Sequence, residues 1–350
     1  MQESSGSRSV DWVRRAILVS GSIACAAAVG AVSSTSVLAG SDRVPRGGRV
    51  VASIRIPQGS GGLAVGDGAV WAMSDSASTL LRIDPKRNIV VARIKVKPSY
   101  PCRPFPQACS EAAAGKRAVW VSHPSDNTAS RIDPQTNRVV ATIPVGRHPD
   151  GIAVSPGAVW VANSGGPTTG SGGPSVSRVD PAANRVVATI EVGSARACCS
   201  DFMELTVGAG SVWVGVPHLT SVVRIDPATN RVRATIRLTV QPFGFLAADK
   251  RAVWSAGAYS DSVVTRLDPR TNRPSGAFNG AAAPIGLALA FGSLWVADLD
   301  SKVIDRVNTH TARIIGRLPV GGYPVRLAVG FGSVWVRDDT GRVLRIRPQR

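Results

Sequence analysis

Signatures of catalysis are scarce in this sequence of 350 residues, which has four histidines and only 5% aromatic residues. No G-x-S-x-G segment occurs, which argues against a serine nucleophile of the α/β-hydrolase type. The Gly-rich run from Gly165 to Gly173 lacks the Lys-Ser/Thr ending of a phosphate-binding loop. The composition therefore favours neither of these two enzyme classes.

Long apolar runs are absent after residue 40, so no later segment is expected to span a bilayer. Before it, Arg14-Arg15 precedes the apolar stretch Ala16 to Val32, and Val37-Leu38-Ala39 fits a small-residue cleavage site. Residues 1–40 are predicted to be a signal peptide, with an uncleaved N-terminal anchor as the alternative, and 41–48 a linker. We expect a secreted or cell-envelope protein, which would contact a membrane only if its N-terminal segment stayed uncleaved.

What the sequence does contain is a repeat with four strand signals and a tryptophan at a fixed place. In each copy a small or turn residue lies five positions before the Trp. Seven such pairs occur: Gly66/Trp71, Gly115/Trp120, Ser155/Trp160, Gly208/Trp213, Asp249/Trp254, Ala290/Trp295 and Gly330/Trp335. Hairpins with Asp-Pro turns, such as Asp133-Pro134, recur beside them. A four-strand repeat of about 40 to 45 residues is typical of a β-propeller blade.

The ends of the repeat array predict how the ring closes. The seventh copy stops after its third strand, and residues 49–56 resemble the outer strand Arg138 to Pro144 of an earlier copy. We therefore predict an all-β, seven-bladed β-propeller over residues 49–350, in which the N-terminal strand completes the last blade. Closure of the ring removes the exposed strand edges that an open array would leave.

Three insertions interrupt the repeat, at Lys97 to Ser110, Ser164 to Pro174 and Ser194 to Met203. Because of the strand order, all three are expected on one face of the propeller, and the regular Asp-Pro turns on the other. Four cysteines lie in these insertions, namely Cys102, Cys109, Cys198 and Cys199. In an exported protein an even number of cysteines indicates disulfides, and three pairings are possible.

A formal net charge of +18 indicates attraction to polyanions, and an anionic cell-envelope polymer is one possible partner. Nucleic acid is not expected, because export is predicted and no stripe alternates aromatic and basic residues. Much of the arginine also repeats with the blades, beside the turn of each hairpin, at Arg82, Arg131, Arg178, Arg224, Arg266, Arg306 and Arg345.

Gly151-Ile152-Ala153-Val154, the run Ala158 to Asn163 and the Arg-Ile-Asp-Pro turns resemble bacterial seven-bladed propellers with YVTN-type repeats and streptogramin (virginiamycin B) lyase. The resemblance covers residues 49–350 and implies the propeller fold. The lyase pattern places a histidine before the Gly-Ile of an inner strand, where this chain has Gly61, Ser110, Asp150, Met203, Gly244, Ile285 and Val325. The lyase pattern of catalytic residues is therefore not matched.

Polar residues predicted near the mouth of the channel are the candidate ligand-binding residues: Glu111, His123, Asp150, Glu204, Asp298, Arg326 and Asp338. They could bind a cationic ligand or a divalent cation such as Mg²⁺ or Ca²⁺, although no cofactor is certain. We expect a binding protein whose insertion-bearing face takes an unknown small molecule or an extracellular or cell-surface protein. The alternative is a lyase- or hydrolase-type enzyme that uses the mouth carboxylates and a metal. Convergence of these residues around a free centre favours the enzyme, whereas scatter or neutralisation by Arg326 favours binding.

Overall fold

The computed structural model describes residues 47–349, apart from 60, 75, 77, 98–108, 166–171, 194–201, 243–244 and 258–261. The chain divides into two units, Met1–Val44 and Pro45–Arg350, and all described residues belong to the second. The predicted signal peptide or anchor lies outside the described residues, as does most of the predicted linker. In the described ranges, no helix has the length and apolar character needed to cross a membrane.

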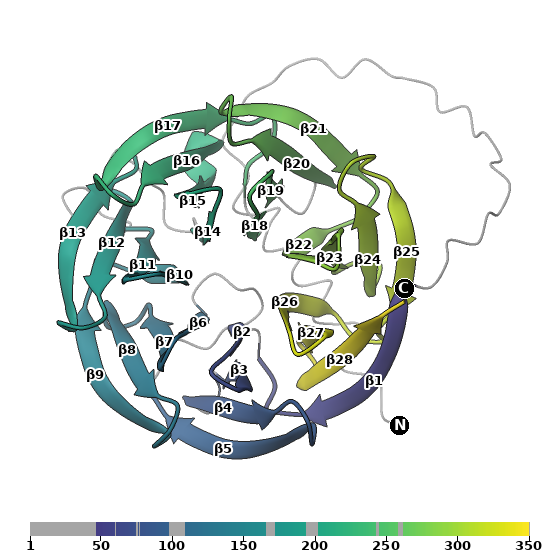
Figure 1. Cartoon of the computed structure of the whole chain (residues 1–350), viewed down its shortest axis with the longest axis horizontal. Helices are drawn as coiled ribbons and strands as arrows, with labels where there is room; N and C mark the ends of the chain where they lie inside the picture. Colours follow the sequence, from purple (N-terminus) through teal and green to yellow (C-terminus); the bar gives the residue numbers. More distant parts are fainter. Residues whose placement is uncertain are drawn as a thin grey trace, which may run out of the picture. The chain divides into compact units, whose positions relative to one another are not determined.

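Seven four-stranded antiparallel sheets form a closed ring, which confirms the predicted seven-bladed propeller (Figure 1). From the inner strand outward, blades 1 to 4 are β2 (Leu63–Gly66), β3 (Ala69–Ser74), β4 (Thr79–Asp84), β5 (Ile89–Lys95); β6 (Ala112–Gly115), β7 (Ala118–His123), β8 (Thr128–Asp133), β9 (Arg138–Pro144); β10 (Pro149–Ser155), β11 (Ala158–Asn163), β12 (Ser175–Asp180), β13 (Arg185–Glu191); and β14 (Leu205–Gly208), β15 (Ser211–Val216), β16 (Ser221–Asp226), β17 (Arg231–Arg237). A short 3-10 helix, η2 (Pro217–Leu219), joins β15 to β16.

Blades 5 to 7 continue the same order. They are β18 (Leu246–Ala248), β19 (Val253–Ala256), β20 (Val263–Asp268), β21 (Arg273–Asn279); β22 (Pro284–Ala290), β23 (Ser293–Asp298), β24 (Val303–Asn308), β25 (Ile314–Pro319); and β26 (Pro324–Gly330), β27 (Ser333–Asp338), β28 (Arg342–Pro348), β1 (Gly48–Arg55). The N-terminal strand β1 pairs antiparallel with β28, with Ile54 opposite Val343. The predicted closure of the last blade by the N-terminal strand is confirmed.

The repeated tryptophans pack between neighbouring blades, and all seven are at most 1% exposed. Trp160 of blade 3, for example, belongs to one core cluster with Val212 and Val214 of blade 4. In five blades the indole N–H also donates to the residue five positions earlier, at 2.9–3.2 Å. This bond explains the fixed spacing, because it ties the Trp to the turn between the first two strands of its own blade.

The repeated arginines connect the blades. Each guanidinium lies over the Trp of its own blade, with 4.9–5.9 Å from Cζ to the ring centroid. In five blades Nη1 also donates to the next blade's Asp-Pro-x-x-Asn turn, to the Pro carbonyl and to the Asn Oδ1. These inter-blade clasps are Arg82 to Pro134/Asn137, Arg131 to Pro181/Asn184, Arg178 to Pro227/Asn230, Arg224 to Pro269/Asn272 and Arg345 to Pro85/Asn88.

The clasp depends on the turn that receives it. All five asparagines have φ between 52° and 58°, a left-handed conformation that Asn tolerates. Arg266 faces blade 6, whose turn has Ala312 in place of Asn, and its Nη1 bonds instead to Ser275 in its own blade. Arg345 bonds to blade 1, so the clasp also joins the two ends of the chain. Much of the repeated arginine therefore holds the ring together.

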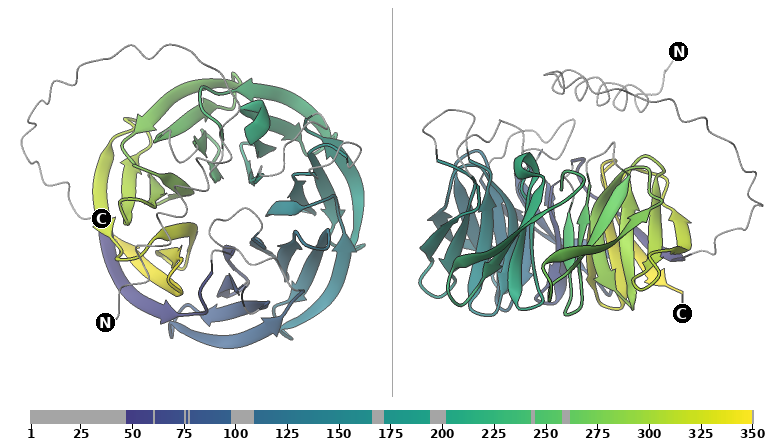
Figure 2. Two further views of the ribbon diagram at one scale, coloured as in Figure 1. Left: turned by 180° about the vertical axis from the view of Figure 1, so that it is seen from behind. Right: turned by 90° about the horizontal axis from the view of Figure 1, so that it is seen from above.

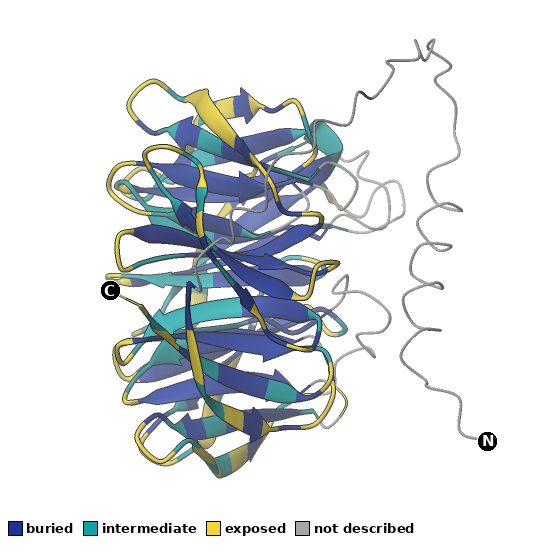
Figure 3. Cartoon of the chain, turned by 90° about the vertical axis from the view of Figure 1, so that its right-hand side faces the viewer, coloured by how far each residue is buried: buried dark blue, intermediate teal, exposed yellow. Residues whose placement is uncertain are grey.

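The two faces of the propeller differ in their connections. The predicted insertions connect β5 to β6, β11 to β12 and β13 to β14, and all begin and end on one face, the insertion face. The turns after each inner strand and the Asp-Pro turns lie on the opposite face, the turn face, as predicted. The side view in Figure 2 (right) shows that the strands run from one face to the other. Figure 3 shows that the middle sections of many strands are buried.

Candidate functional site

The insertion-face end of the channel is occupied by a buried ion pair between blades 2 and 7. Glu111 immediately precedes β6, and Arg326 belongs to β26. The Arg326 Nε lies 2.8 Å from Glu111 Oε1, and Nη2 bonds to the same oxygen. Blade 1 lies between these blades and has Gly62 at the corresponding position, so no side chain from blade 1 separates the pair. Arg326 thus neutralises one of the predicted ligand carboxylates.

Two aromatic rings complete the surroundings of Arg326. Its Cζ lies 4.1 Å from the Phe245 ring centroid and 5.8 Å from that of Phe202. The two rings meet edge to face, with centroids 5.9 Å apart. Since Arg326 is 2% exposed, its charge is compensated by Glu111 and by the ring faces rather than by water. Sequence reasoning missed this contact, because the only available signal was a bulky Phe245 at a strand start where most blades have a small or charged residue.

Glu204 lies beside this pair at the start of blade 4. Its Oε2 accepts the Leu205 N–H at 3.3 Å, whereas no group in the described part of the chain bonds to Oε1. Burial raises the Glu204 pKa well above its ordinary value, and the Glu111 charge raises it further, while Arg326 acts in the opposite direction. The protonated, neutral form of Glu204 is therefore favoured.

Asp150 forms an ion pair with His148, a residue outside the predicted candidate set. Its Oδ1 lies 3.0 Å from His148 Nδ1, and its Oδ2 accepts the Met203 N–H at 3.1 Å. Burial raises the Asp150 pKa, and the hydrogen bond that His148 donates to Asp150 raises the His148 pKa. Ser122 connects this pair to Glu111, since its hydroxyl accepts the Glu111 N–H and donates to the Asp150 carbonyl. The i, i+2 spacing of His148 and Asp150 was the available signal.

His123 does not take part in this cluster. Its ring is fully buried, with Nε2 2.8 Å from Ser130 Oγ and no partner for Nδ1 among the described residues. Burial lowers its pKa to about 4, so the ring is neutral at neutral pH. The predicted role of His123 as a ligand at the mouth has no support in this geometry.

Asp298 of blade 6 and Asp338 of blade 7 accept hydrogen bonds from nearby backbone N–H groups. Asp298 accepts the N–H groups of Ala282, Ala283 and Ser301. Asp338 accepts the Arg342 N–H at 2.9 Å and pairs with the Arg342 side chain at 2.6 Å. Both carboxylates are fully buried and already bonded, so the seven candidates do not converge on one centre.

The remaining predictions concern metals and cysteines. Among the described residues, no group of three or more His, Cys, Asp or Glu side chains is arranged to hold a metal ion. Cys102, Cys198 and Cys199 lie outside the described residues, and Cys109 is fully buried. The disulfide pairing therefore stays a prediction.

The likeness to known proteins supports the fold. The virginiamycin B lyase from Staphylococcus aureus matches with a TM-score of 0.67 and 16% identity, covering 85% of this chain and 99% of the lyase. Hydrazine synthase from Kuenenia stuttgartiensis matches with a TM-score of 0.66 and 14% identity over 83% and 96% of the two chains. BamB from Moraxella catarrhalis matches with a TM-score of 0.58 and 15% identity over 86% and 98%.

Comparison with protein-family models matches a smaller part of the chain. The family model of glutamine cyclotransferase matches residues 165–262, which is less than a third of the chain. No curated protein matches the sequence. These findings define the class as a seven-bladed β-propeller that is structurally similar to virginiamycin B lyase, and the predicted resemblance is confirmed at the level of the fold.

Proposed function

We propose that this chain is an exported propeller that binds a ligand or protein partner through its insertion face. One observation carries the proposal: three of the five acidic side chains predicted at the mouth are already engaged within the protein. Glu111 is paired with Arg326, Asp338 with Arg342, and Asp298 accepts three backbone N–H groups. These groups stabilise the ring and its connections, which favours recognition over chemistry at the mouth.

The cluster of Arg326, Phe245, Phe202 and Glu204 is the feature best suited to recognition. Aromatic rings and arginine are enriched in binding sites, and the half-buried Phe245 lies at the channel mouth. The Glu204 Oε1 is buried without a described partner, and in the protonated form it bears the O–H, so an acceptor group on a ligand would satisfy it. A partner that supplies such an acceptor would gain a hydrogen bond that the free protein lacks.

A paired capture experiment tests this face. Immobilised wild-type protein, Phe245→Ala and Phe331→Ala would be incubated with a cell-envelope extract of the source organism, and bound proteins and small molecules identified by mass spectrometry. Phe331 is 43% exposed in the β26–β27 turn, on the turn face, and is the matched aromatic control. Each variant is first compared with wild type by thermal unfolding.

The proposal predicts a specific pattern. A component captured by wild type should be lost with Phe245→Ala and kept with Phe331→Ala. A component kept by Phe245→Ala, or lost only with Phe331→Ala, would contradict binding through the insertion face. An envelope polymer that elutes with salt from all three proteins equally would indicate only the general positive charge.

The enzyme alternative is tested with the ligand that is bound to a structurally similar protein. A catalytically inactive variant of virginiamycin B lyase from Staphylococcus aureus was solved with quinupristin. We expect no ring-opened quinupristin by liquid chromatography after incubation with this chain. Ring opening that disappears in Asp150→Asn would put the lyase-type alternative ahead, and calorimetric titration with Mg²⁺ and Ca²⁺ tests the predicted cation.

A further inference from the structure

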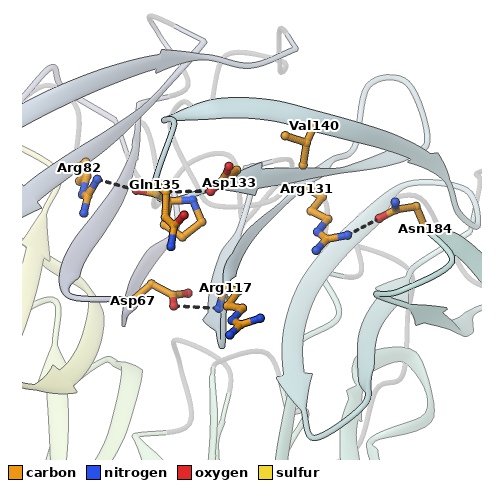
Figure 4. A pocket seen from close by; sticks show the side chains of 9 residues that line it. Asp67, Arg82, Arg117, Arg131, Asp133, Gln135, Val140 and Asn184 are labelled. Carbon is orange, nitrogen blue, oxygen red and sulfur yellow. Dashed lines mark hydrogen bonds between the residues drawn. The ribbon is translucent and has the colours of Figure 1, made fainter.

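A pocket lies on the turn face, opposite the proposed binding face. It has a volume of about 810 Å³ and lies among blades 1, 2 and 3. Its charged lining residues are Arg82, Arg117, Arg131, Asp67 and Asp133 (Figure 4). None of the mouth residues lines this pocket.

Two clasp arginines that line this pocket have an edge without a described partner. Arg82 and Arg131 use Nη1 for the next blade, and no described residue accepts a hydrogen bond from their Nε or Nη2. In blades 4, 6 and 7 the same Nε donates to a serine hydroxyl at 2.8–2.9 Å, in the pairs Arg224/Ser211, Arg306/Ser293 and Arg345/Ser333. Blades 1 and 2 have Ala69 and Ala118 at the serine position. The missing hydroxyl therefore leaves the guanidinium edge open at this pocket.

The two acids of the pocket accept hydrogen bonds from the turns and not from these arginines. Asp133 accepts the Gln135 N–H with Oδ1 and the Thr136 hydroxyl with Oδ2, and so closes its own turn. Asp67 accepts the Arg117 N–H at 2.9 Å. No ion pair joins any of the five charged side chains among the described residues. The pocket thus contains three guanidinium groups against two carboxylates, of which Asp133 is bonded within its own turn and Asp67 to the turn of the next blade.

We propose that this pocket binds a ligand that bears a phosphate or carboxylate group. The Nε–Nη2 edge of arginine matches two oxygens of such a group, and the hydrogen bonds are strengthened by charge. Arg82 and Arg131 would each donate through this edge, while their Nη1 atoms remain in the clasps. The site is independent of the proposed insertion-face function, because it lies on the other face and shares no residue with the mouth.

The test introduces, in the two blades that contribute Arg82 and Arg131, the serine that blades 4, 6 and 7 have at the equivalent position. In the double variant Ala69→Ser/Ala118→Ser, the new hydroxyls should occupy Nε of Arg82 and Arg131 without changing the net charge or the clasps. The matched control is Ala158→Ser in blade 3, beside Arg178, which does not line the pocket. Calorimetry would measure binding of pyrophosphate, citrate and a long-chain polyphosphate to the intact chain at fixed ionic strength.

We expect wild type and Ala158→Ser to bind at least one of these anions alike, and the double variant about 10-fold more weakly or worse, because two charge-assisted hydrogen bonds are lost. Preference for pyrophosphate or citrate would indicate a small ligand, and preference for polyphosphate a polymer. Equal binding by the double variant and wild type would overturn the proposal, as would no binding to wild type. Phe245→Ala should leave anion binding unchanged, which separates this result from the insertion-face test.

Discussion

The inter-blade clasp makes a quantitative prediction about stability. Arg224 donates from Nη1 to Pro269 O and to Asn272 Oδ1, and from Nε to Ser211 Oγ, and its Cζ lies 4.9 Å from the Trp213 ring centroid. At this partly exposed site each hydrogen bond contributes about 1 kcal/mol and the cation–π contact about 0.5–1 kcal/mol. Arg224→Ala should therefore lower the free energy of unfolding by roughly 3–4 kcal/mol.

Substitutions of Asn272 separate its two roles, since it adopts φ 56° and accepts one clasp bond. Asn272→Gly keeps the left-handed conformation and should cost about 1 kcal/mol for the bond alone. Asn272→Ala should cost about 1 kcal/mol more, because Cβ disfavours this conformation. Asn272→Asp keeps an acceptor oxygen and should cost least of the three.

Blade 6 offers the converse experiment. Ala312 has φ 53° at the position that Asn occupies in five other turns, and Arg266 of blade 5 has no clasp. Ala312→Asn should stabilise the protein by about 1 kcal/mol, by relieving the Ala conformation and by supplying an acceptor for Arg266. In thermal unfolding 1 kcal/mol corresponds to about 2 °C for a domain of this size.

The assay is urea unfolding followed by tryptophan fluorescence, with Arg224→Ala, Asn272→Gly and the double variant forming one thermodynamic cycle. A coupling energy of about 1 kcal/mol is expected for the shared bond. Coupling near zero would refute the clasp as an energetic contact. Equal losses for Asn272→Gly and Asn272→Ala would refute the conformational part of the reasoning.

Three further predictions concern the mouth. Arg326→Met should cost about 3–5 kcal/mol in urea unfolding, because the buried Glu111 carboxylate loses its arginine partner, and adding Glu111→Gln should recover part of the loss. Glu204 has a raised pKa, so its stabilising contribution is present below its unfolded pKa and is lost as pH rises through the folded pKa. The melting temperature of wild type should therefore fall relative to Glu204→Gln from acidic toward neutral pH, and parallel curves would contradict this. His148 also has a raised pKa, so its contribution is present below its unfolded pKa and lost above the folded one. NMR titration should place that pKa above its ordinary value in wild type and lower in Asp150→Asn, whereas the same pKa in both proteins would exclude the pair.

The propeller could be predicted because its determinants are local and repeated. In five blades the five-residue spacing before the Trp reflects a bond within one blade, as between Trp71 and Gly66. Ring closure could be predicted because residues 49–56 resemble an outer strand, and β1 pairs with β28 accordingly. Each of these signals depends on residues that are close in sequence or on a direct comparison of copies.

The partners of the candidate residues could not be predicted, because they come from distant parts of the chain. Glu111 and Arg326 are 215 residues apart and meet only across the closed ring. Asp298 has the residue type of a metal ligand, but its partners are backbone N–H groups, two of them in the connection before β22. The recurrence of Arg and of Asn was visible, whereas their pairing across blades, such as Arg224 with Asn272, depends on the ring geometry.

The same contrast bears on where function lies. A residue that recurs in every blade, such as Arg178 over Trp160, meets an equivalent environment each time and stabilises the ring. The insertion-face mouth varies among Gly, Glu, Phe and Arg from blade to blade, and its buried Arg326 and Glu204 satisfy no requirement of the repeat. Burial of ionisable groups opposes folding unless they are compensated. A role beyond folding is therefore the simplest explanation for the presence of Arg326 and Glu204 at one site. On the turn face, alanine replaces the serine in blades 1, 2, 3 and 5, and of the arginines that lack this serine partner only Arg82 and Arg131 line the pocket of the second proposed site.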